Sequence, residues 1–169
     1  MSFWSDLFWV VPLVGIVTLL VVWSYYRSIK KADPGDGKML EIHQAIRTGA
    51  FAFIRREYTS VAWVLLIASP ILYFTLGLPT VVTFLIGALL SLLAGLIGMN
   101  AATLANVRTT QAARTGAVEA LQIAFPAGAI MGLTVVGLNL IGITLLYLIF
   151  PDPELLTGYG LGSSLGALF

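Results

Sequence analysis

Few residues in this chain have side chains that could carry out chemistry, and the most conspicuous of them lie between two long apolar segments. Asp33 and Asp36, in the sequence DPGD, could share a divalent cation, but two carboxylates are too few ligands for such a site. The stretch also lacks the alternating acidic pattern of a calcium loop, so we interpret it as a turn. His43 is the single histidine and cysteine is absent, which excludes a metal centre built from several His or Cys residues. We interpret His43 as a solvated or headgroup-facing side chain.

Motifs for catalysis or phosphate binding are missing from the sequence. It contains no GxxxxGKS or GxxxxGKT loop and no Ser, His and Asp set at a plausible spacing. The long apolar segments contain no ionisable residue, although such residues usually mark a pump or enzyme that works inside a bilayer. We expect their polar residues, notably Asn100 and Asn139, to form hydrogen bonds between helices rather than to coordinate ions. The residues alone therefore predict no catalytic, cofactor-binding or metal-binding site, and they favour a scaffold.

The composition indicates what kind of protein holds these residues. The chain has 169 residues, of which 59% are hydrophobic and only 10% are charged. Soluble domains contain roughly 25% charged residues. We therefore predict an all-α, polytopic membrane protein whose residues 1–169 form a single transmembrane domain. The predicted helices, four that span the membrane and a partial fifth, are 8–26, 60–76, 80–103, 126–149 and a segment from about 156.

The connections between these segments have distinct signals. Pro79 in GLPT suits the first turn of a helix that follows a tight outer turn. Residues 27–57 form a first inner loop, in which apolar residues over 42–54 recur at steps of three and four. This periodicity predicts an amphipathic helix that should lie near the membrane surface and run into the next span. Residues 109–119 form a short second inner loop.

The distribution of charge predicts the orientation in the membrane. All nine Lys and Arg residues fall on the side of the two inner loops, whereas Asp6, Asp152 and Glu154 lie on the opposite side. Cytoplasmic loops carry an excess of Lys and Arg. We therefore predict a multi-pass protein of the cell membrane with its N-terminus outside and its basic loops in the cytoplasm. The partner is then the lipid bilayer, and we expect no nucleic acid.

Small residues at helical spacing predict close contacts between helices. Such residues let the backbones of two membrane helices approach each other, and lining an ion path is the alternative role for the glycines. Gly158, Gly162 and Gly166 recur at steps of four in the last segment. The other candidates for packing are Gly87, Ser91, Gly95, Gly98, Gly128 and Gly132.

Four separated stretches resemble, in the same order, the membrane-bound, ion-translocating inorganic pyrophosphatases. They are GAFAFIRREY at 49–58, the stretch FLIGALLSLLAGLIGMNAATLANVRTTQAAR at 84–114, GAIMGLTVVGLNLIGITLLYLIF at 128–150 and GYGLGSSLGALF at 158–169. The resemblance implies a homodimeric pump that hydrolyses Mg-pyrophosphate on the cytoplasmic side and exports H⁺ or Na⁺. It also makes Ser164 a marginal candidate for the ion path, although Leu165 and Gly166 depart from the Ser-Ile of the family there.

The resemblance covers only the N-terminal portion of such a pump. In the family the last motif continues into an Arg-Val-Gly-Gly segment and an Asp-rich substrate loop, whereas this sequence stops at Phe169. We therefore expect an N-terminal fragment, left by a split gene, an incomplete reading frame or a deliberate truncation, that is inactive alone and contributes no Mg²⁺ ligand. The remaining helices of the pump would then be its partners. The alternative is a non-enzymatic helical membrane scaffold or accessory subunit. The choice between H⁺ and Na⁺ and the dependence on K⁺ rest, in the family, on later helices.

Overall fold

The computed structural model describes residues 2–153 and 155–168, and every regular element within them is an α-helix. Four of the helices are long and apolar enough to cross a membrane, which confirms the predicted all-α polytopic class. In chain order the helices are α1 (Ser2–Lys31), α2 (Gly37–Leu76), α3 (Leu78–Ala112), α4 (Ala117–Ile149) and α5 (Leu155–Leu168).

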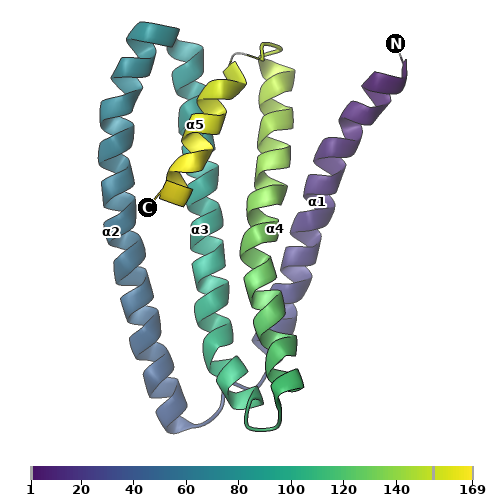
Figure 1. Ribbon diagram of the computed structural model, residues 1–169, viewed down its shortest axis with the longest axis vertical. Coiled ribbons are helices and arrows are strands. Elements are labelled where there is room, and N and C mark those ends of the chain that lie inside the picture. Colours follow the sequence, from purple (N-terminus) through teal and green to yellow (C-terminus); the bar gives the residue numbers. More distant parts are fainter. Residues whose placement is uncertain (1, 154, 169) are drawn as a thin grey trace.

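The helices extend beyond the predicted spans, most of all in α2. Its 40 residues include both the predicted amphipathic helix and the predicted span, without a break between them. The first half of α2 is therefore collinear with the second, so the predicted amphipathic helix runs directly into the predicted span, as we expected (Figure 1). No turn sequence separates the two halves, so the backbone hydrogen bonds of the helix continue through them. As a consequence Arg55, Arg56 and Glu57 lie midway along a helix rather than in a loop.

Two glycines with positive φ make the turns at the ends of α2. Gly35 (φ 82°) lies in the connection before α2, in the predicted DPGD turn. Gly77 (φ 87°) alone separates α2 from α3, and its N–H donates to the carbonyl oxygens of Leu72 and Tyr73. Pro79 follows in the first turn of α3, as predicted. Positive φ strains residues that have a Cβ, so glycine is suited to both positions.

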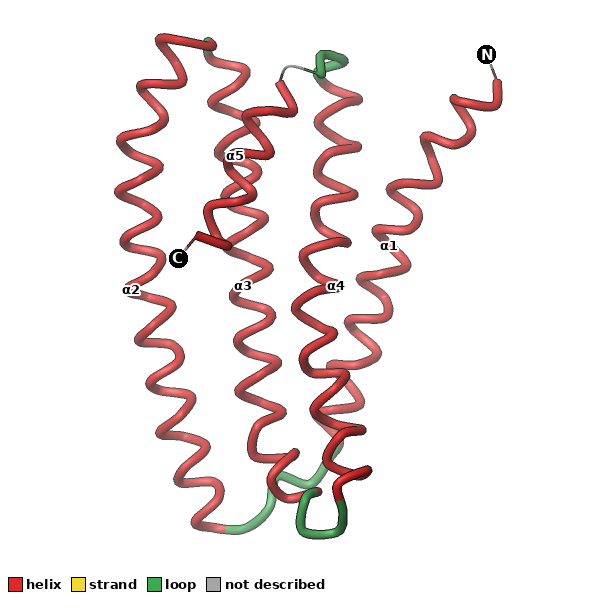
Figure 2. The backbone as a smooth tube through the Cα atoms, viewed as in Figure 1, coloured by secondary structure: helices red, strands yellow, loops and turns green. Residues whose placement is uncertain are grey.

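Helix α3 is the centre of the arrangement. It contacts α2 on one side, α4 on the other, and α5 across the half that is next to the α2–α3 connection, whereas α1 packs mainly on α4 (Figures 1 and 2). The connections α1–α2 and α3–α4 lie together at one end, and the α2–α3 and α4–α5 connections lie at the other. Because α3 touches all the other helices, contacts at α3 determine where they sit.

The basic end of α3 holds the connection between α1 and α2. Arg108 donates from Nε to the carbonyl oxygen of Ala32 (3.1 Å) and from Nη1 to that of Leu104 (2.8 Å). Farther out, Arg114 forms an exposed ion pair with Asp36 (3.2 Å). Arg108 therefore connects two segments that are 76 residues apart in the sequence.

Asp33 belongs to the same connection. It accepts hydrogen bonds from the Gly35 backbone N–H (2.9 Å) and from the Gln111 amide (3.0 Å). These bonds, the Gly35 bond first, lower the pKa of Asp33 from its ordinary value because they favour the charged carboxylate. Asp33 binds Gln111 of α3, and Asp36 binds Arg114 in the α3–α4 connection. The two carboxylates therefore hold the α1–α2 connection in place, in agreement with the turn interpretation.

Replacement of Arg108 should destabilise the protein more than replacement of Arg114. Arg108→Gln leaves the Ala32 carbonyl oxygen without its charged donor, so we expect a loss of about 1.5–3 kcal/mol in the free energy of unfolding. Arg114→Gln removes an exposed pair whose side chains are 58% and 65% accessible, worth about 0–1 kcal/mol. Unfolding of both variants in detergent would measure the difference. Equal losses would contradict a special role for Arg108.

Candidate functional site

The crossing of α3 and α5 is the most tightly built part of the molecule. A Cβ at Gly162 would collide with the backbone carbonyl oxygen of Phe84, and a Cβ at Gly87 with that of Tyr159. A Cβ at Gly158 would lie 2.6 Å from Thr83 Oγ1. No side chain separates the two backbones at these points. This is the close contact that small residues at steps of four predict.

Thr83 adds a hydrogen bond to the crossing. Its side chain is fully buried, and its hydroxyl lies 2.9 Å from the carbonyl oxygen of Leu155 and 3.0 Å from that of Thr80. A buried hydroxyl without an acceptor would be costly in an apolar environment. The hydroxyl therefore connects the first turn of α5 to α3.

Tyr159 ties α5 to α4. Its ring is buried, and its hydroxyl donates to Asn139 Oδ1 (2.9 Å), while the Asn139 amide donates to the carbonyl oxygen of Val135 (2.8 Å). A Cβ at Gly142 would lie 2.5 Å from the Tyr159 hydroxyl oxygen, so the glycine leaves room for the ring. The expected hydrogen bonding of Asn139 between helices is confirmed. Tyr159 was not a predicted site residue, and its only signal is that it is the one aromatic residue within the glycine-rich part of α5.

The predicted packing residues of α3 do not all behave alike. Gly87 contacts α5, and so does Ser91, whose hydroxyl occupies the space that a Cβ at Gly166 would need. Gly98 is close to α4, because a Cβ there would lie 2.7 Å from Met131 Cγ. Gly95 is less crowded, since its nearest neighbour would be the Tyr58 hydroxyl at 3.9 Å. Tyr58 passes beside Gly95 to donate a hydrogen bond to the Leu92 carbonyl oxygen.

Gly128 and Gly132 make no close contact within the described chain. Both are exposed, and no described atom lies within 4 Å of a Cβ built at either position. Helix α4 uses Gly137 instead, where a Cβ would lie 2.9 Å from Leu19 of α1. Gly15 meets Ile141 in the same contact, at 2.8 Å. Helix α4 has small residues on several of its faces, so their spacing alone does not predict which face meets a neighbouring helix.

Ser164 is exposed, and it donates a hydrogen bond to the carbonyl oxygen of Leu161 in its own helix (2.9 Å). The neighbours Gly162 and Leu165 are buried, so Ser164 is on another face of α5 than the one that meets α3. The crossing therefore does not enclose its hydroxyl.

His43 is less exposed than predicted. It borders a cavity of about 80 Å³ between α2 and α3, and its Nδ1 atom is buried without a hydrogen-bond partner among the described residues. The neighbours Ile42, Ile46 and Val107 are apolar. Helix α2 continues straight through this region, so His43 is half-buried against α3 and not solvated.

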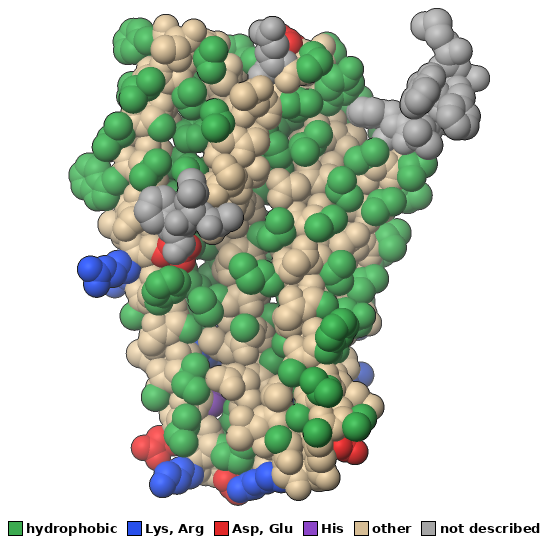
Figure 3. Space-filling view, viewed as in Figure 1, with side chains coloured by type: hydrophobic (Ala, Val, Ile, Leu, Met, Phe, Trp, Pro, Cys, Tyr) green, Lys and Arg blue, Asp and Glu red, His purple; other side chains and the backbone are tan. Residues whose placement is uncertain are grey.

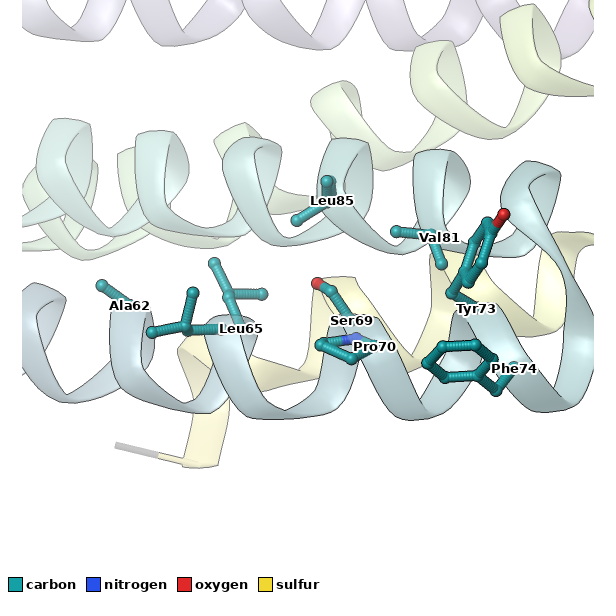
Figure 4. Close-up of a pocket in the computed structure, with 9 residues that line it drawn as sticks. Ala62, Leu65, Ser69, Pro70, Tyr73, Phe74, Val81 and Leu85 are labelled. Carbon is teal, nitrogen blue, oxygen red and sulfur yellow. The ribbon is translucent and has the colours of Figure 1, made fainter.

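The described residues form no metal-binding cluster beside these helix contacts. They contain no group of three or more His, Cys, Asp or Glu side chains that could hold a metal ion. A hollow of about 570 Å³ is an apolar groove between α2 and α3, lined by residues such as Leu65, Pro70, Phe74 and Leu85 (Figure 4). Ser69 and Tyr73 supply its side-chain oxygens. Such a groove suits hydrocarbon and cannot bind a charged substrate.

Comparison with known proteins relates the chain to one family. The family model described as inorganic H+ pyrophosphatase matches residues 16–169. A K(+)-insensitive pyrophosphate-energized proton pump of Methanosarcina mazei is 44% identical over 160 residues, which are 94% of this chain and 24% of that protein. A putative K(+)-stimulated pyrophosphate-energized sodium pump of Clostridium tetani is 43% identical over 158 residues, which are 93% and 24% of the two chains. The chain spans about a quarter of the length of these curated relatives.

Replacement of glycine by alanine in α5 should destabilise the protein at the crowded position Gly162 but not at the uncrowded position Gly160. Gly162→Ala forces the helices apart at Phe84, so we expect it to lower the free energy of unfolding by about 1–3 kcal/mol. Gly160→Ala is the matched control, because a Cβ there meets nothing within 4 Å. It should leave stability unchanged or raise it by up to about 1 kcal/mol through helix propensity. Thermal unfolding in detergent measures both, and equal effects would contradict backbone contact at Gly162.

Proposed function

This chain belongs to the inorganic H+ pyrophosphatase family, and from that premise we propose that it forms the first helices of a pyrophosphate-energised ion pump. The family match over residues 16–169 carries the proposal. The relatives are about four times as long, so the activity belongs to a larger protein of which these helices are one part. In that protein, hydrolysis of pyrophosphate drives the export of H⁺ or Na⁺.

The transported ion is not encoded in these helices alone. The chain is 44% identical to a relative named as a proton pump and 43% identical to one named as a putative sodium pump. The first is named as K(+)-insensitive and the second as K(+)-stimulated. We therefore assign the distinction between the ions, and the response to K⁺, to other parts of the pump.

The role of this part is to hold α5 in place. Backbone contacts at Gly87 and Gly162 and the Tyr159–Asn139 hydrogen bond fix α5 against α3 and α4. The opposite face of α5, with Ser164, stays open to further helices, and Ser164 is the hydroxyl that we propose for the border of an ion path. The proposed cofactor of the complete pump is Mg²⁺. The described residues do not fit a Mg²⁺ site, because they include no cluster of carboxylates.

The multi-pass membrane location follows from the family and the apolar helices. Figure 3 shows Lys and Arg side chains gathered at the end where the α1–α2 and α3–α4 connections lie, with further basic side chains partway up α2. We propose that this end faces the cytoplasm and that the N-terminus is outside, because basic loops are retained inside. We also propose that the complete pump is a homodimer.

Cysteine labelling tests the orientation. The chain has no native cysteine, so Lys38→Cys and Asp152→Cys each introduce a single thiol. In intact cells a membrane-impermeant maleimide should label the thiol at position 152 and reach the one at position 38 only after lysis. Labelling of both thiols from one side would overturn the assigned orientation.

A chimaera tests the function. The first quarter of the Methanosarcina mazei pump would be replaced by this chain, and Mg²⁺-dependent pyrophosphate hydrolysis would be measured in membranes. We expect activity in the chimaera and none in membranes that contain this chain alone. A chimaera with Gly162→Ala should lose activity, because the added methyl group forces α5 away from α3.

An inactive chimaera that is inserted and folded would contradict the proposal and favour the scaffold or accessory subunit. The relative's own protein, split and rejoined at the same junction, is the control for the junction itself. Activity of this chain alone would show that it contains a catalytic site.

A further inference from the structure

A second cavity lies at the basic end of the bundle, apart from the α3–α5 crossing. It has a volume of about 360 Å³ and lies between α1, α3 and α4. Its lining includes Val22, Trp23, Tyr26, Ile97, Asn100 and Thr134. The volume is within the range of small-molecule sites, roughly 300–1,000 Å³. None of the described residues that line it is charged.

A chain of hydrogen bonds forms the polar rim of this cavity. The Asn100 amide donates to the Tyr26 hydroxyl oxygen (3.2 Å), and Arg47 of α2 donates from Nη2 to Asn100 Oδ1 (3.5 Å). Asn100 of α3 therefore joins α1 to α2, two helices that both also contact α3. The Arg47 side chain is exposed, and a guanidinium has five N–H donors, so one bond to Asn100 leaves most of them available.

A second arginine stands beside the same cavity. The Arg27 guanidinium carbon lies 3.8 Å from the ring centroid of Trp23, which keeps the charge close to a lining residue. Trp23 is 55% exposed, so the cavity opens to the surroundings at this ring. Lys30 and Lys31 follow in the last turn of α1. The positive charge is thus concentrated at one end of a hollow whose lining is mainly apolar.

The depth of the cavity matches a membrane interface. Asn100 is 20 residues after Thr80 in α3, which corresponds to about 30 Å along a helix, the thickness of a hydrocarbon core. Trp and Tyr concentrate at the two interfaces of a membrane, and Trp23 and Tyr26 line the cavity together with Asn100. A ligand here would place its apolar part toward the bilayer centre and its polar part among arginines.

We propose that this cavity binds an anionic phospholipid. Part of one acyl chain occupies the hollow between Val22 and Ile97, and the phosphate and its anionic headgroup lie against Arg47 and Arg27. Arginine suits this role because its planar group makes paired hydrogen bonds to phosphate oxygens. The bound lipid also stabilises the Tyr26–Asn100–Arg47 link, so it fastens α1 and α2 to α3. The proposal does not depend on the pump activity.

The test measures lipid affinity and stability in the full chain. Delipidated protein in detergent would be titrated with dioleoyl phosphatidylglycerol or dioleoyl phosphatidylcholine, with bound lipid counted by native mass spectrometry and stability followed by thermal unfolding. We expect tighter binding and greater stabilisation by the phosphatidylglycerol. Arg47→Gln should weaken this binding about fivefold, the factor for one basic residue near an anionic surface. Arg47→Lys should lose less, because it keeps the charge.

Arg55→Gln is the matched control, since Arg55 is an exposed arginine of the same helix whose side chain, unlike that of Arg47, makes no described hydrogen bond to a residue that lines the cavity. It should leave binding unchanged. Dihexanoyl phosphatidylglycerol should bind more weakly than the dioleoyl lipid, and glycerol phosphate should not compete. Equal affinity for the two dioleoyl lipids, an equal loss in Arg55→Gln, or competition by glycerol phosphate would each overturn the proposal, the last in favour of a free phosphate ligand.

Discussion

Direct backbone contact between α3 and α5 is the interaction on which the rest of the arrangement depends. In hydrocarbon, helices gain little from burying apolar side chains, because lipid tails are equally apolar, so close packing and hydrogen bonds must hold them together. Glycine at 87, 158 and 162 removes the side chains that would keep the two backbones apart. Once α5 lies in this groove, Tyr159 can reach Asn139 only if α4 occupies its observed place beside α3. One contact therefore sets the positions of three helices.

Polar side chains serve this packing rather than chemistry. Buried threonines such as Thr134 and Thr144 donate to carbonyl oxygens one turn earlier in their own helix, so they bring no unsatisfied group into the interior. Thr83 and Asn100 reach neighbouring helices instead and link segments that are far apart in the sequence. This use of hydroxyls and amides fits a part of a pump that positions other helices. It leaves the proposed hydrolysis of pyrophosphate to residues elsewhere in the complete protein.

The arginines near the α1–α2 and α3–α4 connections have two roles, one in membrane orientation and one in specific contacts within the protein. They make the loops unfavourable to translocate, and the same arginines bind specific groups, as Arg108 does with Ala32 and Arg47 with Asn100. A charge that only set orientation could be placed anywhere in a loop. In the arrangement observed here, Arg108 instead closes the α1–α2 connection, and Arg47 and Arg27 contact residues that line an apolar cavity.

The sequence by itself determined the helical class, the four long apolar helices, the turns at DPGD and GLPT and the family. These properties depend on local composition and on residues that are close in the chain. The tertiary structure alone decided which small residues are contacts. Gly87 and Gly162 meet a neighbouring backbone whereas Gly128 and Gly132 face outward, although all four have helical spacing with other small residues. It also decided that α2 runs unbroken through 42–54, that His43 is half-buried and that Tyr159 pairs with Asn139. Helical periodicity places residues on a common face, but which face meets a neighbour depends on how distant helices cross, and that information is not local.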